Sequence, residues 1–320
     1  MPAIKLPGRK NMAEIKNQEF KKLIIYDFFM LVFFGIMLIL GTFIDETAAA
    51  ALYSPDNIFI KFVTSAGAFP FFAFAVFFTG ALCQGIISSG LKKPVKILIC
   101  VVFYAAATFV GFIGAGALVD KDSLGSIYPV LNRNIPVIVG ICIVLNTVLL
   151  SLGYKLAKKS GDRNLIKRLI CLLALLGLSY GLMQIFKNTF HRPRFRLAVL
   201  GYDGIGFVPW YTPFPKAAGF IGKFGIDSGE FRSFPSGHSI LSMSMIIVLQ
   251  SLTWFSEKLK DKKLILGMTG MIFAVVIMFS RMVLGAHYLS DVACGAVIST
   301  CIALVYTVIQ NRISDSPAGK

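Results

Sequence analysis

Charged residues are scarce in this chain. They make up 15% of its 320 residues, whereas soluble domains average about 25%. Hydrophobic residues account for 56%, and the mean hydropathy is +0.74. The shortage of charge argues against a soluble domain. It also argues against a nucleic-acid-binding protein, which needs a soluble basic face.

Acidic residues, cysteine and histidine are also few. Sixteen Asp and Glu face 32 Lys and Arg, so the formal net charge is +16. The six cysteines all fall within apolar stretches and form no Cys-x-x-Cys pair, which speaks against disulfides and thiolate metal sites. We therefore expect no thiolate metal site; the sequence also shows no carboxylate cluster typical of a metal site, and no cofactor is expected. The three histidines are examined below, because each lies in a polar cluster.

What the chain does contain is long apolar runs. A bilayer span needs about 20 apolar residues, and eight such windows can be placed. They are 24–44, 66–89, 95–118, 135–157, 165–186, 238–256, 264–281 and 289–310. The sequence therefore predicts an all-α polytopic membrane helical bundle of about eight spans.

The basic residues between these windows predict the orientation. With the N-terminus inside, the inner segments hold 21 of the 32 Lys and Arg residues. Such an excess is typical of cytoplasmic segments. We expect one membrane domain over 24–310, with cytoplasmic tails at 1–23 and 311–320. The tail at 1–23 lacks the apolar core and cleavage site of a signal peptide. An aromatic loop over 187–237 then lies outside.

The histidine clusters all fall at the predicted outer ends of the windows. His287 and Asp291 lie four residues apart, so on a helix they share a face. An Asp that accepts from Nδ1 leaves Nε2 free to attack. Ser236 and Gly237 open a helix that suits an anion, with His238 placed as a general acid. Lys187, Arg192, Arg194 and Arg281 supply positive charge for phosphate oxygens.

Together these clusters resemble three motifs of the type-2 phosphatidic acid phosphatase superfamily, which includes lipid phosphate phosphatases and vanadium haloperoxidases. Lys187-x6-Arg194 is similar to the first motif, although Phe195 replaces the usual Pro, and Arg192-Pro193 comes two residues early. Pro235-Ser-Gly-His238 and Ser280-Arg281-x5-His287-x3-Asp291 match the second and third in full. The first motif resembles the Arg-Pro-Arg-Pro of many bacterial members, which assigns Arg194 to the motif position and Arg192 to a supporting one.

The resemblance implies a role for each residue. His287 is expected to be the nucleophile that forms a phosphohistidine, oriented by Asp291, and His238 the acid that protonates the leaving group. Lys187, Arg194, Ser236, Gly237 and Arg281 are expected to bind the phosphoryl oxygens without a metal. His191 matches no role in the motifs. The usual core has six spans, so the sequence predicts an extra pair, for which 95–157 is the candidate.

The leading interpretation is a metal-independent phosphatase for a lipid phosphate or pyrophosphate, at the outer face of a bacterial cytoplasmic membrane. Its expected partners are that substrate and membrane lipids, not nucleic acid. A phosphotransferase with the same site is the first alternative. A non-catalytic lipid transporter or lipid-binding protein is the second, but it leaves the spacing of His287 and Asp291 unexplained. The many spans favour lipid substrates over halide chemistry.

Overall fold

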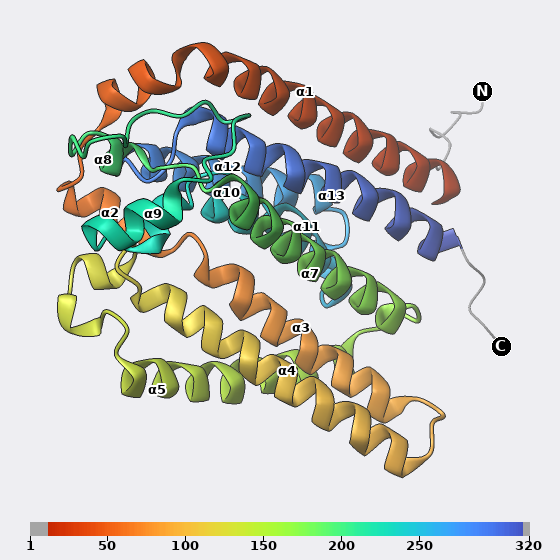
Figure 1. The fold of residues 1–320 in the computed structure, drawn as a ribbon. Helices are drawn as coiled ribbons and strands as arrows, with labels where there is room; N and C mark the ends of the chain where they lie inside the picture. Colours follow the sequence, from red (N-terminus) through yellow and green to blue (C-terminus); the bar gives the residue numbers. More distant parts are fainter. Residues whose placement is uncertain (1–11, 316–320) are drawn as a thin grey trace, which may run out of the picture.

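The computed structural model describes residues 12–315; the ends of the two expected tails, 1–11 and 316–320, lie outside the described residues. The described part is helical and contains no strand. Its long helices lie side by side, with loops and short helices gathered at one end and both termini at the other (Figure 1). The expectation of an all-α polytopic membrane bundle is confirmed.

The long helices follow the apolar windows and extend beyond several of them. α1 and α13 reach into both expected tails, where residues 12–23 and 311–315 are helical. The bounds of the long helices are α1 Met12–Leu52, α3 Phe69–Ser88, α4 Lys93–Val119, α5 Ile135–Leu145, α6 Ser151–Lys159, α7 Leu165–Phe190, α12 Lys263–Val283 and α13 Leu289–Asp315. A π-helical turn, Asn146–Leu150, joins α5 to α6. Among the described residues, seven helical segments are long and apolar enough to cross a membrane.

The sixth expected span, 238–256, is not one long helix. It consists of α10 (Gly237–Met243) and α11 (Met245–Ser251), which meet at Ser244. The hydroxyl of Ser244 donates to the carbonyl of Ile240 at 2.9 Å, and that of Ser242 donates to the carbonyl of Ser239 at 3.3 Å. Such side-chain bonds compete with helical backbone bonds. The segment is almost entirely buried and packs against α12 and α13.

Residues 95–157, the candidate for the extra pair, form a hairpin. α4 and the continuous α5–α6 segment pack against α3, and α4 also packs against α5. Two glycines allow the closest approach: a Cβ on Gly80 would lie 2.2 Å from the Leu150 carbonyl oxygen, and one on Gly153 would lie 1.9 Å from that of Phe77. The connection between α4 and α5, residues 120–134, returns to the end of the molecule that carries the short helices (Figure 1).

The loop over 187–237 has a small core of its own. It contains α8 (Phe195–Ala198) and α9 (Ala217–Phe224), and lies at the same end as α2 (Ile58–Ser65) (Figure 1). Buried Leu197, Ile205, Ala217 and Phe231 pack together. The Phe214 ring stacks between Phe220 and Phe231, with centroids 5.8 and 6.1 Å apart. The aromatic residues therefore fold this loop onto itself above the helix ends.

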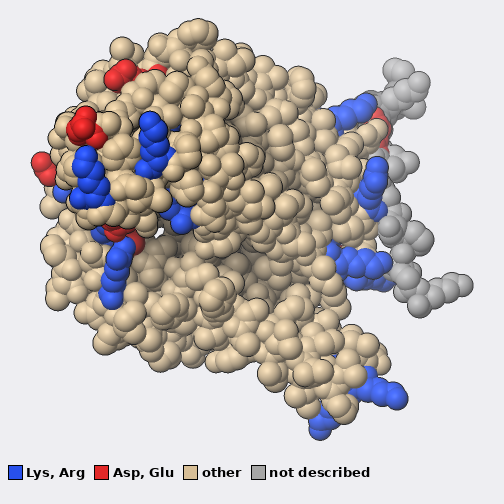
Figure 2. Space-filling model, viewed as in Figure 1, with Lys and Arg blue, Asp and Glu red and all other residues tan. Residues whose placement is uncertain are grey.

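Charge is distributed in the way a membrane protein requires. In Figure 2 the Lys, Arg, Asp and Glu side chains gather at the two ends of the visible face, and an uncharged band separates them. The end near the termini shows mostly Lys and Arg, whereas the opposite end shows both signs. Because uncovered charge is costly in hydrocarbon, the uncharged band is the membrane-facing surface.

Candidate active site

The three motifs meet at the end of the bundle that carries the short helices. Lys187 is in the last turn of α7, His238 is in the first turn of α10, and His287 lies in the connection between α12 and α13. All three line one cavity of about 390 Å³ together with Arg194 and Gly237. A hollow among the charged side chains is visible at this end in Figure 2. The structure therefore brings together residues that are up to 100 positions apart in the chain.

His287 is held by a backbone carbonyl. Its Nδ1 lies 2.7 Å from the carbonyl oxygen of Ser233 and 3.7 Å from Oδ2 of Asp291. The sequence predicted Asp291 as the direct acceptor, and in this detail the structure differs. A carbonyl can only accept, so Nδ1 carries the proton and Nε2 is left with its lone pair. The structure therefore gives the expected tautomer, with the proton on Nδ1, but the carbonyl of Ser233 fixes it instead of Asp291.

Asp291 is fully occupied by other donors. Its carboxylate accepts from the backbone N–H of Tyr288 at 2.8 Å, from Nη1 of Arg192 at 2.6 Å, and from the hydroxyl of Ser233. Ser233 thus contacts both members of the pair, since its carbonyl accepts from His287 and its hydroxyl donates to Asp291. Asp291 fixes the backbone directly after His287 and adds negative charge near the ring.

Burial dominates the titration of His287. The side chain is 1% exposed. Loss of solvent lowers the pKa of His287 to about 3, a shift that Asp291 opposes and the nearby cations, among them Arg281 and Lys187, reinforce. The imidazole is therefore neutral at physiological pH, as a nitrogen nucleophile must be.

The second motif forms the start of α10. Ser236 is the N-cap, and its side chain accepts from the backbone N–H of Ser239 at 3.3 Å. The N–H groups of Gly237 and His238, at the first two helical positions, have no carbonyl to bind within the helix. A Cβ on Gly237 would lie 3.2 Å from Cε of Lys187 and 2.7 Å from the sulfur of Met183. Glycine is needed here because the lysine packs directly on the backbone.

Several buried polar atoms around the cavity lack partners. Nε2 of His238 and the Nε atoms of Arg194 and Arg281 are buried without a hydrogen-bond partner among the described residues. Lys187 donates to the carbonyl of Arg232 at 2.9 Å. Unpaired buried polar atoms are costly and therefore uncommon. His238 and Arg194 line the cavity, and Arg281 contacts Asp122, which also lines it, so these atoms favour a site that is completed by an anionic ligand.

Arg192 does not face this cavity. It is fully buried, with Nη2 2.9 Å from Asp45 and Nη1 2.6 Å from Asp291, while its Nε donates to the carbonyl of Val208 at 2.7 Å. Its guanidinium carbon lies 4.1 Å from the centroid of the Tyr288 ring. Sequence placed Arg192 among the phosphate-binding residues in a supporting role. The structure places it elsewhere: Arg192 contacts Asp291 and does not line the cavity.

Three residues at the site were missed from sequence. Ser233 holds His287 and Asp291, Asp45 on α1 pairs with Arg192, and Asp122 between α4 and α5 accepts from Arg194, Arg196 and Arg281. Ser233 stands three residues before Ser236, so closeness to a motif was an available signal. For Asp45 and Asp122 the sequence signal was weaker: each is a carboxylate at the predicted outer end of a membrane span.

His191 lies outside the cluster. It follows α7 in a left-handed conformation, with φ of 47°, and does not line the cavity. Glycine or asparagine commonly occupies such a position at a helix end. This placement agrees with the expectation that His191 has no catalytic role.

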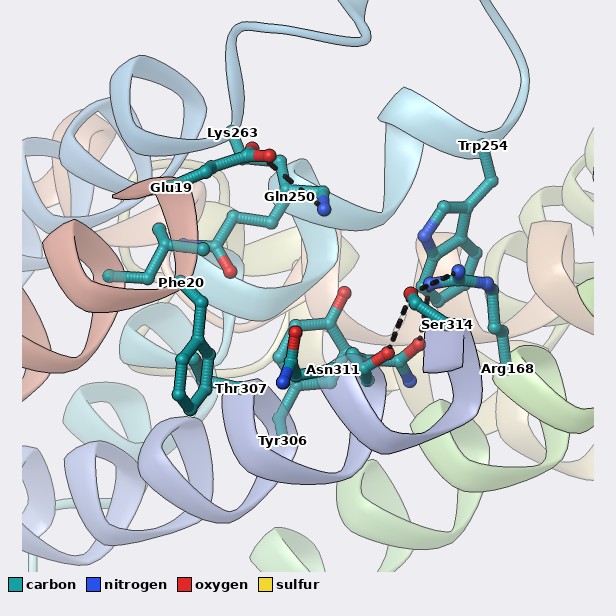
Figure 3. Close-up of a pocket in the computed structure, with 12 residues that line it drawn as sticks. Glu19, Phe20, Arg168, Gln250, Trp254, Lys263, Tyr306, Thr307, Asn311 and Ser314 are labelled. Carbon is teal, nitrogen blue, oxygen red and sulfur yellow. Dashed lines mark hydrogen bonds and ion pairs between the residues drawn. The ribbon is translucent and has the colours of Figure 1, made fainter. Parts of the chain in front are cut away.

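A second, much smaller polar pocket lies at the end that carries the termini. Its volume is about 40 Å³, and Figure 3 shows Arg168, Tyr306 and Ser314 among the side chains around it. Arg168 donates to Ser314 at 2.7 Å and to Gln310 at 3.1 Å. None of the three histidines lines it. These contacts join α7 to α13.

Within residues 12–315, no group of three or more His, Cys, Asp or Glu is arranged to hold a metal ion.

Comparison with known families agrees with this placement. Residues 168–315 match the model of the PAP2 superfamily, which confirms the resemblance that the three motifs indicated. The matched segment runs from α7 to α13 and contains all three motifs, whereas Asp45 and Asp122 lie before it. Members of the superfamily are phosphatases that act on phosphate esters. No curated protein and no solved structure matches the chain.

Proposed function

We propose that this protein is an integral membrane phosphatase of the PAP2 superfamily that hydrolyses a lipid phosphate or pyrophosphate through a phosphohistidine. One observation carries the proposal. His287 keeps Nε2 free because Nδ1 is bound to Ser233, and it lines the same cavity as His238 and the cationic residues. This is the arrangement that nucleophilic attack on a bound phosphoryl group needs.

The proposed reaction has two steps. In the first, Nε2 of His287 attacks phosphorus, the bond to the leaving oxygen breaks, and His238 gives its proton to that oxygen. In the second, His238 takes a proton from water, the water oxygen attacks phosphorus, and the P–N bond breaks to release phosphate and restore His287. The negative charge of a bound phosphate favours the protonated form of His238 before the first step.

The phosphoryl oxygens are bound by the cradle. Lys187 and Arg194, which line the cavity, and Arg281, which contacts Asp122 there, provide positive charge. The N–H groups of Gly237 and His238 provide neutral donors. Ser236 is fully buried as the N-cap, so we assign its contribution to shaping this turn. Such donors stabilise the charge that develops on the equatorial oxygens during phosphoryl transfer.

A lipid substrate is supported by the rest of the cavity wall. Besides the charged residues, the cavity is lined by Phe72, Ile113, Ala117, Met183 and Leu241, which come from α3, α4, α7 and α10. A site whose wall combines charged and apolar side chains suits a molecule with a phosphate head and a hydrocarbon chain.

An outer-face site is supported by the distribution of basic residues. Lys and Arg concentrate at the end away from the cavity, which includes the turn between α3 and α4 and the segment 258–263 (Figure 2). Basic segments stay in the cytoplasm. The cavity therefore opens on the other side of the membrane in this proposal.

Phosphate release from a panel of lipid phosphates, measured in detergent with EDTA, tests the function. We expect release from at least one lipid, complete loss in His287→Ala, and near-normal rates in His191→Ala, which controls for replacing a histidine outside the cavity. Transfer of the phosphoryl group to an added alcohol instead of water would indicate the phosphotransferase. Lipid binding without turnover of any substrate would indicate the non-catalytic protein.

A further inference from the structure

Asp122 is the feature of the site that the family motifs do not explain. It lies in the connection between α4 and α5, outside the family-matched segment, and lines the cavity with His238 and His287. Its side chain is 8% exposed. A buried carboxylate in a cavity meant for an anion requires a reason, because like charges repel.

Three guanidinium groups converge on this carboxylate. Oδ2 accepts from Nη1 of Arg194 and, at 2.9 Å, from Nη2 of Arg281, and Oδ1 accepts from Nη1 of Arg196 at 2.8 Å. Arg281 also donates from Nη1 to the Asp122 carbonyl at 3.4 Å. Asp122 therefore joins an arginine of the first motif to the arginine of the third, which are 87 positions apart in the chain.

Asp122 engages only the outer nitrogens of Arg194 and Arg281. Each of these arginines keeps a buried Nε that has no partner among the described residues. A guanidinium group is planar and rigid, so anchoring its Nη atoms also fixes the direction of the Nε–H bond. Without a shared carboxylate, the positive groups of Arg194, Arg196 and Arg281 would repel one another at this spacing.

We propose that Asp122 is a positioning residue that holds Arg194 and Arg281 in the geometry that binds phosphate. The inference rests on the proposed function, because it takes the cavity to be a phosphate site. The hairpin of α4 to α6 then completes a cradle whose other residues belong to the family-matched segment. The opposite possibility is that Asp122 occupies the phosphate position and is displaced by the ligand.

The variant Asp122→Asn distinguishes these possibilities, because the first predicts weaker binding of a phosphate mimic and the second predicts unchanged or tighter binding. The probe is orthovanadate, a phosphate mimic, and the measurement is its dissociation constant by titration calorimetry on the full chain in detergent. Positioning predicts binding at least about tenfold weaker, the scale of one lost charge-assisted hydrogen bond. Unchanged or tighter binding would overturn the proposal. Asp122→Glu, which keeps the charge, should recover part of the affinity at an unchanged melting temperature.

Asp120→Asn is the matched control. Asp120 lines the same cavity, and its carboxylate accepts from the backbone N–H of Asp122 at 3.1 Å, a bond that an Asn oxygen can still accept. Among the described residues, Asp120 forms no hydrogen bond or ion pair with an arginine. Its replacement therefore removes one negative charge without releasing the cradle. We expect the vanadate affinity to stay within about threefold; a loss equal to that of Asp122→Asn would refute positioning by contact.

A measurement on the wild-type protein covers the case in which Asp122→Asn does not fold. Hydrogen exchange of residues 120–126 is compared with and without saturating orthovanadate. A positioning residue stays in place, so exchange should be unchanged or slower. Faster exchange would mean that the ligand expels Asp122, and would overturn the proposal. If wild-type protein does not bind orthovanadate at all, the phosphate site itself is refuted.

Discussion

At the residue scale, the two arginines of the first motif have separate roles. Arg194 lines the cavity, whereas Arg192 lies between the buried carboxylates of Asp45 and Asp291. Arg192, for which the sequence predicted a supporting role at the phosphate, is thus the ion-pair partner of Asp291, which lies near His287. The two side chains should respond to replacement in different ways.

Arg192→Ala should mainly destabilise the fold. The change leaves two buried carboxylates without their counter-ion, a defect that costs about 3–5 kcal/mol. Arg194→Ala should mainly slow turnover, by about 10²–10³ in kcat, because it removes a donor to developing charge. Melting temperature and kcat, measured on both variants, check the pair. A stable Arg192→Ala protein with wild-type melting temperature would contradict the assignment.

The pH at which kcat/KM falls on the acidic side should show that His287 is buried. Activity falls as pH decreases through the pKa of this group, because the protonated imidazole cannot attack. Since burial lowers the pKa of His287 to about 3, the acidic loss should come well below the ordinary histidine value of about 6.5. A profile corrected for the second ionisation of the substrate, near pH 6, measures it. An acidic limb centred near 6.5 would show that His287 is solvated.

Spacing along the chain explains which site residues could be predicted. His287 and Asp291 are one helical turn apart, and Ser236 to His238 are consecutive, so sequence alone places each group. Arg192 meets Asp45 across 147 positions and Arg194 meets Asp122 across 72. Such pairs depend on how helices pack, which no local pattern encodes. The contact between the Ser233 carbonyl and His287 could not be predicted either, because backbone groups have no sequence signature.

At the element scale, the hairpin of α4 to α6 links membrane packing to the site. Its helices lie against α3, and its connecting loop carries Asp122. In the same loop, Lys121 lies 2.8 Å from Glu230 and 3.3 Å from Asp227, which attaches this loop to the segment 187–237. The windows predicted all these helices, but the break of the expected span at Ser244 depends on serine side chains that bond to the backbone.

Gly153→Ala should loosen this hairpin. The new Cβ would lie 1.9 Å from the Phe77 carbonyl oxygen, so α6 must move away from α3. Overpacking of this kind costs about 1–3 kcal/mol, which should lower the melting temperature. Gly177→Ala on α7 is the control, because nothing lies within 4 Å of its added Cβ. Equal melting temperatures for the two variants would show that α3 and α6 are not in close contact.

At the scale of the whole molecule, we expect the cavity to face away from the cytoplasm. Single cysteines at Gly206 and Lys260, both exposed positions, can be introduced after the six natural cysteines are replaced. In intact cells, an impermeant thiol reagent should label the cysteine at 206 and spare the one at 260. Labelling at 260 alone would reverse the topology and place the site in the cytoplasm.

The central claim is that His287 carries the phosphoryl group during turnover. The direct measurement is mass spectrometry of the protein after quenching with alkali, in which a phosphorus–nitrogen bond survives, during turnover of a lipid phosphate. The account predicts one phosphoryl group on the peptide that contains His287, and none in His287→Ala. Phosphate release by His287→Ala at the wild-type rate, or phosphorylation of a different residue, would contradict it.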